Sequence, residues 1–359
     1  MALLWFDGFE SYTAVADIIV AGISSPFTQV TSPEGAFSIG AYGRRSSRGI
    51  QTLYNKYLTY YLASNYVTLY FGMAVKLSSG TLSAYTNSTV LINNRSLVGF
   101  GADGYAHITL MPISASSEFD VYNGTTYLGT TSGFGMVTGV WLYVEVMVTI
   151  DDSAGAVIVK VNGNEVLNLS NVDTKDNTGG AYVNQIKVGG TQNIVLFSDD
   201  LYICDATGDA PHNGFLGDVR VDVLRPDGEG TYKTDFAGSP DVSSNLNVDE
   251  TSGPDDDTTY NYGSDVGDKD TYTLGALPAP SSTTIYGVKS QITVKKTDAG
   301  SREVKVLTRA GTTDDLSATV SLSDSYTTAV KIYEDNPDDA AAWEDADVNA
   351  MEVGVEIVT

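Results

Sequence analysis

Adjacent carboxylates form the clearest chemically active pattern in this sequence. Asp151-Asp152 and Asp199-Asp200 each follow a run of apolar residues, and Asp255–Asp257 lies in a polar segment. Carboxylate oxygens at a loop rim suit Ca²⁺, a hard cation that takes oxygen ligands. Asp151, Asp152, Asp199 and Asp200 are therefore candidate calcium ligands, and no other cofactor is predicted. The alternative is a solvated turn, because no pair fits an EF-hand loop.

Residues for hydrolytic catalysis are sparse. The two histidines, His107 and His212, lie far apart and in segments predicted to belong to different domains. A Ser-His-Asp triad needs a base oriented beside a nucleophile, and the sequence has no GxSxG or HExxH motif. His107 lies in the strand-like run AHITL, where a structural role is favoured. Cys204 is the single cysteine, so no disulfide is expected and a buried, inert thiol is predicted.

Two further groups of side chains could bind a partner. Arg44, Arg45 and Arg48 are clustered in an otherwise acidic chain. They could contact an acidic neighbouring subunit or simply form a solvated loop. The tyrosines of 54–61 and 122–127 could bind sugars as aromatic platforms, or pack on sheet faces with their hydroxyls at the edge.

The charge is strongly negative and uneven. Lys and Arg number 20 against 45 Asp and Glu, a net charge of −25, and most of the excess follows Asp205. Such a surface repels phosphate backbones and anionic lipid, so neither nucleic acid nor membrane is an expected partner. The first residues, MALLWFDGFE, lack the positive start and long apolar core of a signal peptide, and no apolar run is long enough for a membrane span.

Side-chain alternation predicts β-structure throughout the chain. In WLYVEVMVTI one predicted face holds apolar side chains, namely Leu142, Val144, Val146, Val148 and Ile150. This period of two predicts a strand. The run AVIVKV follows, and Asn162-Gly163 is a strong hairpin signal before EVLNL. QIKVGG and NIVLFSDDLYICD supply further strands, and DVRVDVL at 218–224 alternates in the same way.

The block WLYVEVMVTI–DDSAG–AVIVKVNGNEVLNLS, followed by QIKVGG and DDLYICD, resembles the back half of a concanavalin A-like jelly roll of the laminin-G or pentraxin type. The resemblance covers residues 1–205 and implies that the last strand pairs with the first. Glucanases of this fold place their carboxylates on one strand in an ExDxxE-type motif. Here Glu145 stands alone on its strand, so the chain is predicted not to be an enzyme.

The whole layout is similar to uncharacterised virion structural proteins of tailed bacteriophages. The similar segments are an opening LLWFDGFE, then GFLGDVRVDVLRPDGEGTYKTDF, TTIYGVK and AAWEDADVNAMEVGVEI. This resemblance implies a place in the virion, after assembly in a host cytoplasm. The expected partners are other virion proteins and further copies of the chain as a homo-oligomer.

We therefore expect an all-β protein with two domains. Residues 1–205 form the jelly roll, 206–217 a linker, and 218–359 an acidic β-sandwich with a long polar excursion at 228–270. The predicted function is a non-catalytic structural protein of a bacteriophage particle, as head decoration or tail component. The alternatives are an adhesin that binds a host-surface glycan, and a glycan-degrading enzyme.

Overall fold

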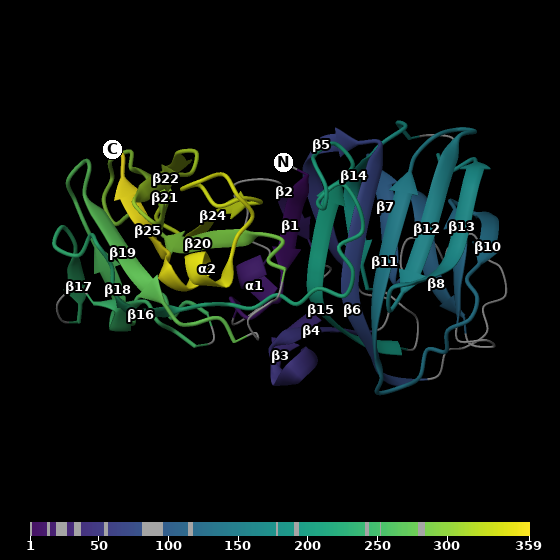
Figure 1. Ribbon diagram of the computed structural model, residues 1–359, viewed down its shortest axis with the longest axis horizontal. Helices are drawn as coiled ribbons and strands as arrows, with labels where there is room; N and C mark the ends of the chain where they lie inside the picture. The colour runs from purple at the N-terminus through teal and green to yellow at the C-terminus, as the bar shows by residue number, and fades with distance from the viewer. Residues whose placement is uncertain are drawn as a thin grey trace. The chain divides into compact units, whose positions relative to one another are not determined.

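The computed structural model describes the chain except for residues 1, 13–14, 19–26, 32–36, 54–56, 81–95, 114–117, 177–178, 190–193, 241–243, 252 and 279–283. The described residues form two compact units, and their regular secondary structure is almost entirely β-strand (Figure 1). The first unit ends at Val221 and the second begins at Asp222, with Glu10 and its neighbours grouped with the second. The predicted all-β sandwich class is confirmed.

The first unit contains two large antiparallel sheets. Sheet A contains β1 (Leu3–Asp7), β3 (Phe37–Gly40), β4 (Gly49–Thr52), β6 (Thr68–Gly80), β11 (Trp141–Thr149), β12 (Gly155–Val161), β13 (Asn164–Val172) and β15 (Ile194–Asp205). Its order is β13-β12-β11-β6-β15-β4-β3, with β1 paired to β15. Sheet B contains β2 (Phe27–Thr31), β5 (Leu58–Tyr66), β7 (Val98–Ala102), β8 (Tyr105–Ile113), β9 (Glu118–Asn123), β10 (Thr126–Thr130) and β14 (Val183–Val188), in the order β10-β9-β8-β7-β14-β5-β2. Two short helical segments, α1 (Val15–Ile18) and η1 (Arg44–Ser46), complete the unit.

The core of this unit lies between the two sheets. Phe71 of β6 and Phe100 of β7 meet edge to face, with ring centroids 6.1 Å apart, and both side chains are buried. Since one ring comes from each sheet, the contact defines a two-layer sandwich. The alternation predicted for β11 is confirmed, because Val144, Val146 and Val148 are almost completely buried.

Three local predictions for this unit are confirmed. The first and last strands pair, because β1 runs antiparallel to β15. The Asn162-Gly163 turn joins β12 to β13 with φ values of 50° and 78°, the left-handed conformation that a two-residue hairpin turn requires. Cys204 is buried, at 0% exposure.

Residues 206–221, here called the crossing segment, lie against the outer face of sheet A. The Phe215 ring meets Tyr70 of β6 edge to face, and Leu216 is buried. The expected linker at 206–217 is thus part of the first unit. The strand predicted at 218–224 is wrong, since these residues join no strand and Val221 donates its N–H to the Asp200 carboxylate.

The second unit has three antiparallel sheets. The largest contains β16 (Pro226–Glu229), β19 (Lys269–Leu274), β21 (Glu303–Ala310), β22 (Thr313–Leu316), β23 (Val320–Ser321) and β25 (Glu352–Ile357). The other two are β17 (Ala237–Ser239) with β18 (Tyr260–Tyr262), and β20 (Val288–Val294) with β24 (Thr327–Tyr333). The polar excursion expected at 228–270 therefore contains short strands, together with η2 (Asn245–Asn247).

The core of the second unit includes an aromatic pair beside a short helix. Tyr333 and Trp343 meet edge to face, and Val348 of α2 (Asp345–Ala350) packs in the same cluster. Glu344 and Asp347 form a capping box at the start of α2, which satisfies backbone N–H groups there. In the described part of the chain, no helix is both long and apolar enough to cross a membrane.

Candidate functional site

The predicted carboxylate pair at Asp199-Asp200 and the predicted arginine cluster meet on the outer side of sheet A. Arg44 donates to Asp200 at 3.2 Å and, through both of its terminal nitrogens, to Asp218 at 2.7 and 3.0 Å. Arg45 donates to the same Asp200 oxygen at 3.0 Å. Arg48 lies half-buried at the end of this loop. Arg44 and Arg45 are thus bound by carboxylates of their own unit.

Asp199 binds the backbone of the arginine loop. Its Oδ2 accepts the Arg44 N–H at 2.6 Å and the Ser47 hydroxyl at 3.1 Å. Burial, with the neighbouring charge of Asp200, raises the pKa of Asp199 to about 7. Burial likewise raises the pKa of Asp200, against the opposing effect of the Val221 N–H and the two guanidinium groups. The pair positions a loop and the crossing segment.

Glu145, the lone acid of β11, binds the same crossing segment. Its Oε1 accepts the Tyr202 hydroxyl at 2.5 Å and the Gly217 N–H at 2.8 Å, and its side chain is only 1% exposed. The Tyr202 oxygen in turn accepts the Leu216 N–H at 3.1 Å. The polar groups on this face of sheet A are therefore engaged by the chain itself, which makes it a packing surface.

The remaining predicted site residues also have local partners. Asp151 accepts the N–H groups of Ser153 and Ala154 at 2.8 and 2.7 Å, which lowers its pKa, and Asp152 pairs with Lys175 at 3.1 Å. Among the residues that the structure describes, no group of three or more His, Cys, Asp or Glu side chains could hold a metal ion.

His107 is completely buried on β8. Its Nδ1 accepts the Asp176 N–H at 2.9 Å, and burial lowers its pKa. This fits the expected structural role. His212 is buried within the crossing segment. Of the tyrosines at 54–61, Tyr54 lies outside the described residues.

A different surface, the outer face of sheet B, has a row of polar and aromatic side chains. Backbone register places six residues in one line across six strands, here called the Lys187 row: Thr59, Lys187, Gly99, Thr109, Tyr122 and Tyr127. Residues directly opposite each other in a ladder point to the same face. Ile186 and Phe100, next to row members, are completely buried in the core, so the row points outward.

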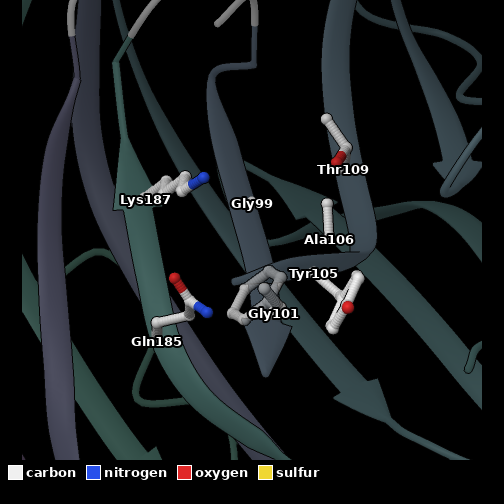
Figure 2. Close-up of a pocket in the computed structure, with 8 residues that line it drawn as sticks. Gly99, Gly101, Tyr105, Ala106, Thr109, Gln185 and Lys187 are labelled. Carbon is white, nitrogen blue, oxygen red and sulfur yellow. The ribbon is translucent and has the colours of Figure 1, made fainter. Parts of the chain in front are cut away.

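A shallow hollow lies at the centre of this row (Figure 2). Gly99 and Gly101 of β7 form its floor, because neither contributes a side chain between the flanking strands. Lys187 and Gln185 approach from β14, and Tyr105 and Thr109 lie on the β8 side. The enclosed part, about 10 Å³, holds about one water-sized group, and the rest is open to solvent.

Lys187 is the charged group of the hollow. Burial lowers its pKa, and no carboxylate of the described chain forms an ion pair with it. Its ammonium lies over the Tyr57 ring, 5.1 Å from the centroid. On either side of Lys187 in the row, the hydroxyls of Thr59 and Thr109 are buried and lack a hydrogen-bond partner. Lys187 and Thr109 thus line the hollow with unfilled bonding capacity, and Thr59 has the same on the far side of Lys187.

The outer end of the row is aromatic. Tyr122 and Tyr127 meet edge to face with centroids 5.7 Å apart, and Tyr127 is 54% exposed. The Tyr127 hydroxyl and the Thr130 hydroxyl share a hydrogen bond of 2.7 Å, and Thr130 donates to Asp120 at 2.5 Å. These bonds fix the orientation of an exposed ring.

The Asp103-Gly104 turn joins β7 to β8 beside the hollow, between the lining residues Gly101 and Tyr105. Both residues have positive φ, at 51° and 94°, as a two-residue hairpin turn requires. Asn184 donates to Asp103 at 2.9 Å, and the Gln185 amide, with its oxygen toward the turn, accepts the Asp103 N–H at 3.2 Å. Gln185 therefore positions the turn.

The sequence indicates that the tyrosines at 122–127 could bind sugars, but it does not mark Lys187 as a site residue. A signal was present, because QIKVGG puts one charged residue in an apolar strand and VGFGA puts two glycines in another. A glycine inside a strand commonly marks a close approach or a missing side chain. Their juxtaposition depends on strand order, which the pattern alone does not give.

Comparisons with known proteins concern the fold. No protein-family model matches the chain, and no curated protein matches it. Several solved structures match 56% of this chain. An endo-beta-1,4-glucuronan lyase from the fungus Trichoderma reesei is 12% identical, with 95% of its chain covered and a TM-score of 0.36. Alginate lyase Aly36B is 14% identical, with 97% covered and a TM-score of 0.38. Domain 4 of AbnA, an arabinanase of Geobacillus stearothermophilus, in complex with arabinotriose, is 15% identical, with 94% covered and a TM-score of 0.37.

These comparisons contradict the prediction that the chain is not an enzyme. That prediction excluded catalysis because a glucanase-type set of carboxylates is missing, whereas two of the similar structures are polysaccharide lyases. The comparisons also give no support to the predicted resemblance to virion proteins. The jelly-roll-like sandwich is the part of the resemblance that stands.

Proposed function

We propose that the first unit binds a glycan along the Lys187 row. The observation that carries this proposal is the row itself: partner-less polar groups at and beside a hollow, continued on the same face by the Tyr122–Tyr127 pair, of which Tyr127 is exposed. Sugars offer hydroxyls for such polar groups and flat apolar ring faces for aromatic side chains.

The form of the hollow favours a polymer over a small molecule. Pockets for small ligands are deep enough to bury most of the ligand surface. Here the enclosed volume admits a single water-sized group, so a small ligand would stay mostly in water. A polysaccharide gains affinity differently, by placing one group in the hollow and further sugar rings along the strands toward Tyr127.

The first experiment measures binding of the full chain to a panel of neutral and acidic polysaccharides by affinity electrophoresis and calorimetry. Tyr127→Ala should weaken binding about five- to tenfold, since an aromatic platform contributes on the order of 1 kcal/mol beyond its buried area. Tyr262→Ala is the matched control, because Tyr262 is 53% exposed but belongs to the second unit. Selective binding to no glycan, or equal losses in both variants, would refute the proposal.

A second candidate function is eliminative cleavage of an acidic polysaccharide at the same hollow. The observation that favours it is the lowered pKa of Lys187, because a base must be neutral to accept a proton. Neutral Lys187 would take the proton from the carbon next to the sugar carboxylate. A carbon–carbon double bond would form as the bond from the adjacent carbon to the glycosidic oxygen breaks, and the protonated Lys187 would return its proton to that leaving oxygen. Ultraviolet absorbance of the unsaturated product tests this reaction directly.

A further inference from the structure

Lys187 differs from the ion-paired cations of this protein. Carboxylates outnumber Lys and Arg by 45 to 20, so a basic side chain readily finds an acidic neighbour. Lys175 pairs with Asp152 at 3.1 Å, and Arg302 pairs with Asp298 at 2.6 Å. Lys187 is half-buried, and burial is the cause of its lowered pKa, with no neighbouring charge contributing. A partly dehydrated ammonium without a counter-ion is costly unless a ligand supplies one.

From this arrangement we infer that the glycan is acidic and that a sugar carboxylate docks on Lys187. The inference rests on the proposed glycan-binding function and names the ligand class. A carboxylate would give Lys187 its missing counter-ion. It would also offer an acceptor to the Thr109 hydroxyl, which is buried on the other side of Gly99 without a partner.

The net charge makes this inference specific to the site. A chain of charge −25 repels a polyanion over most of its surface. Binding of an acidic polysaccharide therefore cannot come from diffuse attraction and needs a local cation that the protein has left unneutralised. Lys187 is such a cation, and it lies on the same face as the exposed Tyr127.

The test compares one polymer in two chemical forms, a polyuronate and its carboxyl-reduced neutral form, by calorimetry at neutral pH. The full chain should bind the polyuronate at least tenfold more tightly. Lys187→Gln should weaken polyuronate binding about ten- to hundredfold, the range for a lost hydrogen bond to a charged group, and should weaken neutral-form binding much less. Lys187→Arg should restore part of the loss. The matched control, Lys175→Gln, removes an equal charge outside the hollow and should leave affinity within about twofold.

Each outcome separates the two proposals. If both polymer forms bind equally and Lys187→Gln has no effect, the carboxylate inference fails and glycan binding stands. If a sulfated polymer of the same backbone binds more tightly than the polyuronate, the choice of carboxylate is wrong. If no polymer binds, the proposed function itself fails. Circular dichroism of Lys187→Gln confirms that the variant is folded before any of these results is interpreted.

Discussion

Lys187 of β14 and Gly99 of β7 lie directly opposite each other in the ladder between the two strands. A long cationic side chain therefore has beside it a strand position that carries no side chain. Thr109, opposite Gly99 on its other side, completes the set with a hydroxyl that lacks a partner. The hollow exists because β7, the middle of the strands β14, β7 and β8, has a glycine at this point and therefore no side chain.

Gly99→Ala should therefore separate binding from stability. An added methyl would be 3.5 Å from the Ser96 hydroxyl and 3.8 Å from that of Thr109, which are ordinary contacts. Because alanine in a strand is favoured over glycine by about 0.5–1 kcal/mol, we expect the fold to be kept or slightly stabilised. The methyl fills the hollow, so glycan affinity should fall at least about fivefold, as measured by calorimetry alongside thermal unfolding.

Gly101→Ala is the contrasting variant on the same strand. A methyl at Gly101 would overlap the carbonyl oxygen of Tyr105, which is backbone and cannot rotate away. This variant should lose about 1–3 kcal/mol of unfolding free energy. A stable Gly101→Ala variant, or a Gly99→Ala variant with unchanged affinity, would show that the glycine floor does not define the site.

Local patterns in the sequence predict most strands because each strand of the sandwich buries one face. Val144, Val146 and Val148 alternate with less apolar residues, and the structure buries all three. The same reasoning fails at 218–224, where Val219, Val221 and Val223 alternate equally well but join no strand. There the Asp200 carboxylate binds the Val221 N–H, and alternation does not reveal which partner a backbone N–H will find.

The site was harder to predict than the fold because it depends on neighbours that are distant in sequence. Lys187, Gly99 and Tyr127 come from three strands that are far apart in sequence, β14, β7 and β10, and share a row only through the strand order of sheet B. Arg44 and Asp200 are conspicuous charges in the sequence and are predicted as site residues. In the structure they form an ion pair with each other. Lys187 is inconspicuous in the sequence, and its importance comes from the lack of such a partner.

Glu145 should contribute strongly to stability through the crossing segment. Glu145→Ala leaves the Tyr202 hydroxyl and the Gly217 N–H without their acceptor in a buried setting. We expect a loss of about 2–4 kcal/mol of unfolding free energy in denaturant titrations, with faster amide hydrogen exchange at Gly217. Glu145→Gln keeps an acceptor oxygen and should cost less.

Glu165→Ala is the control for this prediction, since Glu165 is exposed on β13 and should change stability by no more than about 0.5 kcal/mol. Unchanged exchange at Gly217 in the Glu145→Ala variant would contradict the assigned role of Glu145 in holding the segment.

The raised pKa of Asp199 predicts a pH dependence of stability. Its folded-state pKa of about 7 is above the ordinary value of 3.8, so the folded state holds a proton that the unfolded state releases. The resulting stabilisation is complete below the unfolded value and is lost as pH rises through about 7. Asp199→Asn should flatten unfolding free energy between about pH 4 and 7, measured by urea titration. An unchanged slope would show that Asp199 does not carry this proton.

The pH dependence of the hollow distinguishes glycan binding from glycan cleavage, because the two functions use opposite forms of Lys187. Burial lowers the pKa of Lys187 from its ordinary value of 10.5. Docking of a carboxylate needs the ammonium, so affinity should be greatest below the lowered pKa and should fall as pH rises through it. Proton abstraction needs the neutral amine, so turnover should rise through the same pH. Calorimetry and ultraviolet absorbance on one polyuronate follow both quantities in parallel.

Lys187→Arg sharpens the comparison, because its guanidinium stays charged across the range. That variant should keep its affinity at high pH and form no unsaturated product. Turnover by Lys187→Arg would exclude the Lys187 amine as the base, and a pH-independent affinity of the unaltered chain would exclude its ammonium as the docking group.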